Sequence, residues 1–247
     1  MSQTLIVYCP KVHHLDPWNS LPMPLGCRKS PNRHGILFHG FADDSQRSKR
    51  MLVGEIHVEK NTMVDCIADI ELQCRSHGLK LDADKSYVIW LGTRQQLAMI
   101  NQDDIDIYLP SGILQSSETA CNLGVIIDQQ MTFDAQAHTC SRSCFYHLRR
   151  IWQIRRFIDD RSLRSLVHAL ATSRLDYCNG LLANCSVSDC QWLQRIQNCA
   201  ARLVCSEQAL SHATPLLRRL HWLSVARCIM YKLYILLFDV FHSTAPT

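Results

Sequence analysis

Residues 36–44 have the sequence ILFHGFADD, an apolar stretch that ends in two adjacent carboxylates, Asp43 and Asp44. The apolar and aromatic residues predict a β-strand over 36–41. If the chain turns back there, the two carboxylates lie at the tip of a hairpin. Carboxylate oxygens suit Mg²⁺ and Mn²⁺, which often keep water and substrate phosphates as further ligands. The pair therefore predicts a divalent-metal site, although Asp is also common in ordinary turns, where its side chain bonds the nearby backbone.

The sequence after the Asp pair predicts a small sheet with one helix. Residues 47–50, RSKR, stand where a hairpin needs an apolar partner strand, so the sequence predicts a poorly formed second strand. Apolar residues recur at helical spacing over 62–77, and Gly78 stands in the usual position for a helix end. Runs rich in β-branched and aromatic residues predict three further strands, at 85–91, 105–109 and 122–128.

The pattern changes to a helical period after Asp134. Helices are predicted over about 135–157, after a cap at Asp159 or Asp160, after a cap at Ser188, and over about 225–241. Residues 1–35 contain five prolines and no lasting periodicity, which predicts an irregular segment. The order of elements predicts an α+β fold with three parts: the irregular segment over 1–35, a sheet region over 36–133 and a helical region over 134–247.

Composition limits the class of protein and its compartment. The chain has 247 residues, of which 47% are hydrophobic, and it contains no run of 18 apolar residues, so no membrane span is predicted. The first ten residues lack the basic start and apolar core of a secretory signal. Thirteen cysteines follow no regular framework and include no C-x-x-C pair, which predicts reduced thiols in an intracellular protein, nuclear or cytoplasmic.

The net charge of +4 hides an asymmetry between the two halves of the chain. Acidic residues outnumber basic ones over 51–141, and basic residues, nearly all Arg, outnumber acidic ones over 142–232. Such a basic half indicates a polyanionic partner, and the planar guanidinium fork suits phosphate. Solvated helix faces would account for the same residues. The basic residues densest in sequence are Arg142, Arg149, Arg150, Arg155, Arg156, Arg161 and Arg164.

From Phe38 onward the chain resembles the reverse transcriptase of a non-LTR retrotransposon of the LINE type. Six motifs carry the resemblance and follow in the family's order over about 36–246. The palm motifs are FADDSQ at 41–46, GLKLDADKS at 78–86 and LGVIID at 123–128. The motifs of the helical segment after the palm are RLDYCN at 174–179, QNCAARL at 197–203 and LHWL at 220–223.

The resemblance implies a fold and a chemistry. Residues 36–133 would form part of a palm, a small antiparallel sheet with a helix, and 134–247 a helical thumb with a C-terminal extension. The reaction implied is RNA-directed DNA polymerisation, a nucleotidyl transfer from dNTP by two Mg²⁺ or Mn²⁺ ions, with no other small-molecule cofactor. By resemblance, Asp43 and Asp44 are the metal ligands, and Lys85 protonates the departing pyrophosphate. A surface lysine that opens a strand is an equally good interpretation of Lys85.

The resemblance also implies nucleic-acid partners, an RNA template and the RNA–DNA duplex. Gly124 would let the backbone approach the primer end. Arg149, Arg150, Arg155 and Arg156 would follow the phosphate backbone, and the duplex would be recognised by its A-form shape. Two strand aromatics, Tyr87 and Trp90, could serve as stacking platforms, but alternating strand aromatics are more often core.

The chain departs from the family pattern before the Asp pair. The family requires a third carboxylate on an upstream strand, a template-holding loop and a fingers domain, and Asp16 is the sole acidic residue before Asp43. We therefore expect a truncated copy without polymerase activity. Two alternatives stay open: a nucleic-acid-binding module that uses the Arg-rich helices, and a non-enzymatic interaction protein that uses an uncovered strand over 88–91.

Overall fold

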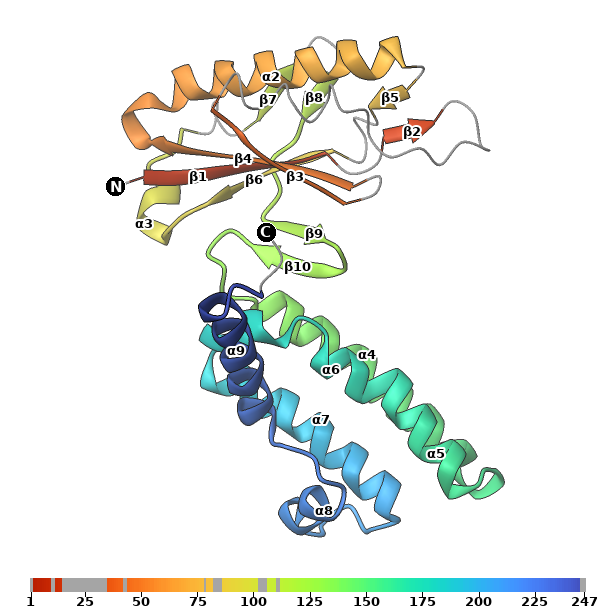
Figure 1. Ribbon diagram of the computed structural model, residues 1–247. Coiled ribbons are helices and arrows are strands. Elements are labelled where there is room, and N and C mark those ends of the chain that lie inside the picture. Colours follow the sequence, from red (N-terminus) through yellow and green to blue (C-terminus); the bar gives the residue numbers. More distant parts are fainter. Residues whose placement is uncertain are drawn as a thin grey trace. The chain divides into compact units, whose positions relative to one another are not determined.

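The computed structural model describes residues 2–9, 12–14, 35–41, 44–77, 79–81, 86–101, 106–109 and 112–244. The chain divides into two compact units, Met1–Met131 and Thr132–Thr247. The first unit combines small antiparallel sheets with helices, and the second consists of helices (Figure 1). The predicted α+β class is confirmed.

A four-stranded antiparallel sheet organises the first unit. Its strand order is β3 (Leu37–Phe41), β4 (Asp44–Leu52), β1 (Ser2–Cys9) and β6 (Tyr87–Leu91). A short strand β2 (Val12–His14) pairs with β5 (Leu79–Leu81). The prediction that residues 1–35 are irregular is therefore wrong for β1 and β2. The run TLIVYC at 4–9 has strand composition, and pairing with β4 on one side and β6 on the other fixes it as a strand.

The charged segment after the Asp pair forms a regular strand, contrary to the prediction from residues 47–50. Strand β4 has nine residues and pairs with β3 from Phe41–Asp44 to Leu37–Ser48. Arg47 is fully buried, and its guanidinium lies 5.4 Å from the ring centroid of Phe38. Lys49 Nζ lies 2.7 Å from Glu59 Oε2. Long basic side chains can cover apolar surface with their stems. Arg47 and Lys49 also have partners on neighbouring elements, so these charged residues can occupy positions in the sheet.

One face of the sheet is covered by helix α2 (Ile56–Ser76), which follows a 3₁₀ turn, η1 (Val53–Glu55) (Figure 1). The helix begins six residues before its predicted start at 62. Its fully buried side chains recur three or four residues apart and pack with Val88 and Trp90 of β6. These helix residues are Met63, Cys66, Ile67, Ile70 and Cys74.

The opposite face of β6 packs against a hairpin made of β9 (Thr119–Asn122) and β10 (Val125–Asp128). Ile89 and Ala120 are buried there. The Tyr87 hydroxyl donates to the Cys121 carbonyl oxygen and accepts from the Cys121 N–H, each at 3.0 Å. Trp90 is 1% exposed, so both strand aromatics are structural. The remaining elements of this unit are the short helix α3 (Arg94–Leu97) and the paired strands β7 (Ile107–Leu109) and β8 (Gly112–Leu114).

The strand over 87–91 is covered on both faces, so the prediction of an uncovered strand is wrong. Its free edge is also engaged, because the Val88 N–H donates to the Gln115 carbonyl and the Val88 carbonyl accepts from the Ser117 N–H. Val88 and Trp90 face α2, and Ile89 faces the β9–β10 hairpin. The sequence identified the apolar strand but not the segments that cover it.

The second unit is built on two long helices, α4 (Asp134–Ile154) and α7 (Val187–Cys205), whose buried sides pack together. Between them in sequence lie η4 (Arg155–Phe157), α5 (Asp160–Val167), the π-helical turn η5 (His168–Thr172), α6 (Ser173–Asp176) and η6 (Asn179–Asn184). The last helices are α8 (Ala213–Arg219) and α9 (Val225–Phe241). The predicted helices over 135–157 and 225–241 are confirmed, as is the cap at Asp159, which accepts from Arg161 N–H and Ser162 N–H.

Three helices end in a left-handed residue that is not glycine. After α7, α8 and α9 the residues in this conformation are Ser206, His221 and Ser243, with φ of 59°, 56° and 55°. In each case the next N–H bonds back across the helix end, as in Trp222 N–H to the Leu217 carbonyl at 2.8 Å. These Schellman ends satisfy carbonyls that the last turn leaves open. Among the described residues, no helix combines the length and hydropathy needed to cross a membrane.

Candidate nucleic-acid interface

The Asp pair lies at the junction of β3 and β4. Phe41 pairs with Asp44, so the sequence between these paired residues consists of Ala42 and Asp43 alone. Asp44 is the first residue of β4. Asp43 lies outside the described residues, as does Lys85, so the roles implied for them stay predictions.

The strands beside β4 supply no further carboxylate. β4 pairs with β3 on one edge and with β1 on the other, and Cys9 of β1 stands opposite Ser45. Neither β1 nor β3 contains Asp or Glu. In the described part of the chain, no three His, Cys, Asp or Glu side chains come together in a way that could hold a metal ion. The residues beside Asp44 therefore do not fit the three-carboxylate centre that the resemblance requires.

Gly124 occupies the turn of the β9–β10 hairpin, close to β4. Leu123 and Gly124 have φ of 46° and 81°, the two positive values that a tight two-residue hairpin turn needs. Glycine adopts this conformation without steric cost, whereas Leu123 is strained there and its side chain is 44% exposed. The Asn122 side-chain amide donates to Gln46 Oε1 at 3.2 Å. Gln46 is two residues beyond Asp44, about 7 Å along a strand, so the turn lies near the Asp end of β4.

The four predicted phosphate-contacting arginines differ in their surroundings. Arg149, Arg150 and Arg156 are exposed, and Arg156 lies 4.6 Å from the centroid of the Phe157 ring. Arg155 is half-buried: its guanidinium donates to Ser206 Oγ and lies 3.6 Å from Asp160 Oδ1. Arg155 therefore ties η4 to α5 and to the end of α7, and the other three arginines are free to face a partner.

Three exposed aromatic side chains are close in sequence to these arginines: Tyr146 lies on the outward face of α4, Trp152 lies about 100° round the helix from that face, and Phe157 lies in η4. Positions 142, 146, 149, 150 and 153 share one face of α4, opposite its buried residues. Tyr146 is 60% exposed, Trp152 70% and Phe157 73%. Guanidinium groups suit phosphate, and exposed aromatic rings can stack on bases. The sequence contains this pattern, because a helical projection of 142–157 brings Arg and aromatic residues together, but the aromatic residues were not predicted as contacts.

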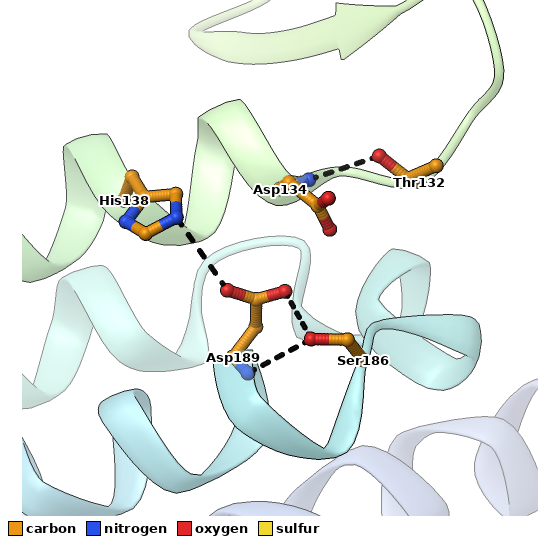
Figure 2. Close-up of polar contacts among 5 residues, drawn as sticks. All are labelled: Thr132, Asp134, His138, Ser186 and Asp189. Carbon is orange, nitrogen blue, oxygen red and sulfur yellow. Dashed lines mark hydrogen bonds and ion pairs between the residues drawn. The ribbon is translucent and has the colours of Figure 1, made fainter.

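A Ser–Asp–His cluster joins the starts of α4 and α7, and Figure 2 shows its geometry. The Ser186 hydroxyl donates to Asp189 Oδ2 at 2.5 Å and accepts from the Asp189 N–H at 3.0 Å. His138 Nε2 lies 3.8 Å from Asp189 Oδ1. The hydroxyl is bonded to the carboxylate rather than to the imidazole, so the cluster lacks the order of a nucleophilic triad. It caps α7 instead, and the cap is Ser186, two residues before the predicted Ser188.

The role of Ser186 leads to a stability prediction. Ser186→Ala should lower the free energy of unfolding by about 1–2 kcal/mol, because the helix loses its cap and the buried Asp189 carboxylate loses a hydrogen bond. Urea unfolding followed by helical circular dichroism measures the change. Ser188→Ala is the matched control at an exposed position of the same turn and should stay within about 0.5 kcal/mol of the parent chain. The reverse order would show that the cap is assigned to the wrong serine.

Two cysteines of α4 form a second polar contact between helices. The Sγ atoms of Cys140 and Cys144 lie 3.9 Å apart, and Cys144 Sγ also lies 3.6 Å from the Ala171 carbonyl oxygen. The hydrogen bond with Cys144 lowers the pKa of Cys140, as does the nearby Arg174 charge, although burial opposes this. The same bond and burial raise the pKa of Cys144. Both thiols face neighbouring helical turns, which indicates a packing role.

Searches against protein-family models, curated proteins and solved structures found no match.

Proposed function

We propose that the chain derives from the palm and thumb of a LINE-type reverse transcriptase and binds an RNA–DNA duplex or RNA through its helical unit, without polymerising. The observation that carries the binding proposal is the outward surface of α4 and η4, where exposed arginines alternate with exposed aromatic rings. We call this surface the α4 interface and define it as Arg142, Tyr146, Arg149, Arg150, Trp152, Arg156 and Phe157.

The first unit supports the proposed descent. A four-stranded antiparallel sheet with one helix on a face suits the palm implied by the motifs at 41–46 and 78–86. Asp44 is paired with Phe41 at the start of β4, and the Gly124 turn is tied to the same strand through Asn122 and Gln46. These positions are those expected of a metal-binding turn and a primer-positioning turn.

The α4 interface supports binding by phosphate contact and stacking. The α4 helix contains a single acidic residue, Asp134, at its first position, so its outward face carries arginines and no carboxylate. Each guanidinium that neutralises a phosphate releases condensed counterions, which drives association. The rings of Tyr146, Trp152 and Phe157 can stack on unpaired bases of any sequence beside the duplex. Sequence selection would then come from base pairing within the duplex and not from the protein.

Salt dependence tests the binding proposal. The full chain should bind a fluorescein-labelled RNA–DNA hybrid of about 20 base pairs, and log K should fall linearly with log salt with a slope of about −3 to −4, as four phosphate contacts predict. Fluorescence anisotropy between about 50 and 200 mM salt measures the slope. Affinity that stays constant over this range would contradict phosphate contact.

The proposed lack of polymerisation rests on the strands beside Asp44. A two-metal mechanism requires carboxylates that hold both ions in a fixed geometry, and β1 and β3 supply none. The full chain should therefore extend an annealed DNA primer on an RNA template no faster than buffer, with Mg²⁺ or with Mn²⁺. Incorporation of dNTP that Asp43→Ala abolishes would show instead that the chain is an active polymerase.

A further inference from the structure

A basic cavity lies within the helical unit, between α7, α8 and the start of α9. Its volume is about 840 Å³, within the range of small-molecule and cofactor sites. Three arginines and two histidines line it, and the described residues of its wall include no Asp or Glu. The positively charged or titratable residues are Arg202, Arg218, Arg227, His212 and His221. None of them belongs to the α4 interface.

The backbone around the cavity fixes two of these residues. Arg202 Nε donates to the Ser211 carbonyl oxygen at 2.8 Å, which orients its guanidinium. His221 adopts the left-handed conformation with φ of 56°, and its N–H donates to the Arg218 carbonyl at 3.1 Å. A non-glycine residue in this conformation carries a steric cost that the surrounding structure must offset. The Schellman end of α8 thus holds His221 and Trp222 at the cavity wall.

The start of α9 adds a second source of positive potential. Ser224 and Arg227 from its first turn line the cavity, and this turn contains no acidic residue. The Ser224 side chain makes no cap hydrogen bond, and the Val225 N–H is held by Gln194 Oε1 at 2.9 Å. A helix start carries a partial positive charge and favours anions, so an arginine in this turn opposes the helix dipole. The positive charge of Arg227 therefore interacts unfavourably with the dipole of α9.

Like charges that converge without a counter-charge destabilise the folded state, and a bound anion removes that cost. The Glu207 carboxylate accepts from Ser211 Oγ at 3.3 Å, and the described lining residues themselves include three arginines and no carboxylate. The indole of Trp222 forms an aromatic part of the same wall. Guanidinium groups, a helix start and an aromatic ring together suit a nucleotide, whose phosphate and base are joined through the sugar.

We propose that this cavity binds a phosphate group of a nucleic-acid strand. The choice of nucleic acid rests on the proposed function, whereas the phosphate chemistry rests on the cavity alone. Arg218 and Arg227 are exposed and contact the phosphate oxygens, Arg202 is the oriented third donor, and Trp222 contacts the adjoining base. The site is a second contact, separate from the α4 interface, that engages a single-stranded segment.

The test compares two double variants of the full chain with equal loss of charge. R218Q/R227Q removes the two exposed guanidinium groups of the cavity, and R161Q/R164Q removes two exposed ones from α5. Binding of a labelled 12-nucleotide single-stranded RNA is measured by anisotropy, and binding of inorganic pyrophosphate by titration calorimetry. We expect R218Q/R227Q to lose about tenfold in RNA affinity and about 1.4 units of salt slope, and R161Q/R164Q to lose less than about threefold.

The outcomes separate the cavity from the proposed function. Equal losses in both double variants, or no loss in R218Q/R227Q, would overturn the cavity site. Loss of pyrophosphate binding with unchanged RNA affinity would also overturn the site as proposed, because the cavity would then bind phosphate but not a nucleic-acid strand. If RNA–DNA hybrid affinity falls on substitution of Arg149 and Arg150 but RNA affinity is unchanged in R218Q/R227Q, the proposed function stands and the cavity site fails. The opposite pattern rejects the α4 interface and retains the cavity.

A stability control keeps the test interpretable. Arg227 carries a charge that opposes the dipole of α9, so the single variant R227Q should unfold at a temperature no lower than that of the parent chain in phosphate-free buffer. Arg218 is kept in this control because it lies in the last turn of α8, where a positive charge is favourable. Circular dichroism melting measures this. A lower melting temperature of R227Q would show that Arg227 stabilises the apo protein, which would contradict the repulsion on which the cavity site is based.

Discussion

Replacing Arg149, Arg150 and Arg156 together with Gln is expected to lower the affinity of the chain for an RNA–DNA hybrid about 100-fold at roughly 0.1 M salt, and to reduce the salt slope by about three. All three side chains are exposed, so their removal leaves no buried group unpaired. The loss should come from phosphate contacts, because each of these arginines releases counterions when it meets the backbone. Anisotropy titrations at several salt concentrations measure both quantities.

The control variant replaces three exposed arginines outside the α4 interface, Arg161, Arg164 and Arg195, and so removes the same charge. It should lower the affinity by less than about fivefold, since only the long-range potential changes. Equal losses in the two triple variants would show that net charge alone drives binding and that the α4 interface has no special role. Arg155→Gln should mainly lower stability, because Arg155 joins Asp160 and Ser206 within the protein.

Ile196→Ala is expected to lower the free energy of unfolding of the helical unit by about 3 kcal/mol, within the range found for buried Ile→Ala changes. Ile196 lies on the buried side of α7 and is fully buried, and α7 packs against α4. The substitution removes three carbon atoms from a site enclosed by two long helices, which cannot close the resulting cavity freely. Urea unfolding followed by circular dichroism measures the change.

Val187→Ala is the matched control on the same helix, because Val187 is 76% exposed and should change stability by less than about 0.5 kcal/mol. A loss at Ile196 no larger than the loss at Val187 would contradict the packing of α4 on α7. The α4 interface is the outward side of helix α4. Such a result would therefore also remove the structural basis of the α4 interface.

The helical half of the fold was predictable from the sequence because each helix there carries its own apolar period. The sheet was less predictable, since its central strand β1 lies in a segment with many prolines and is stabilised by pairing with distant strands. β4 was missed for another reason: Arg47 is buried against Phe38 and Lys49 is paired with Glu59. A one-dimensional pattern treats such residues as solvent-facing, because their partners are not local in sequence.

Helix ends show the same limit at the scale of single residues. Ser186 and Ser188 are equally acceptable as cap residues by type. The structure distinguishes them, because the Asp189 N–H donates to the Ser186 hydroxyl. The ends of α7, α8 and α9 lack glycine, so the usual sequence marker for a left-handed end is missing. The density of basic residues in the sequence predicted the arginines of the candidate site. It did not predict the structural role of Arg155, because its partner Ser206 is far away in sequence.

Photochemical crosslinking tests the central claim, that the α4 interface contacts nucleic acid, most directly. An RNA–DNA hybrid with a single-stranded RNA overhang that contains 5-iodouracil, bound to the full chain at about 100 mM salt and irradiated, should attach to peptides that contain Tyr146, Trp152 or Phe157, since iodouracil crosslinks to aromatic rings stacked on an unpaired base. Peptide mass spectrometry identifies the attachment sites. Crosslinks confined to residues outside 142–157 would contradict the account.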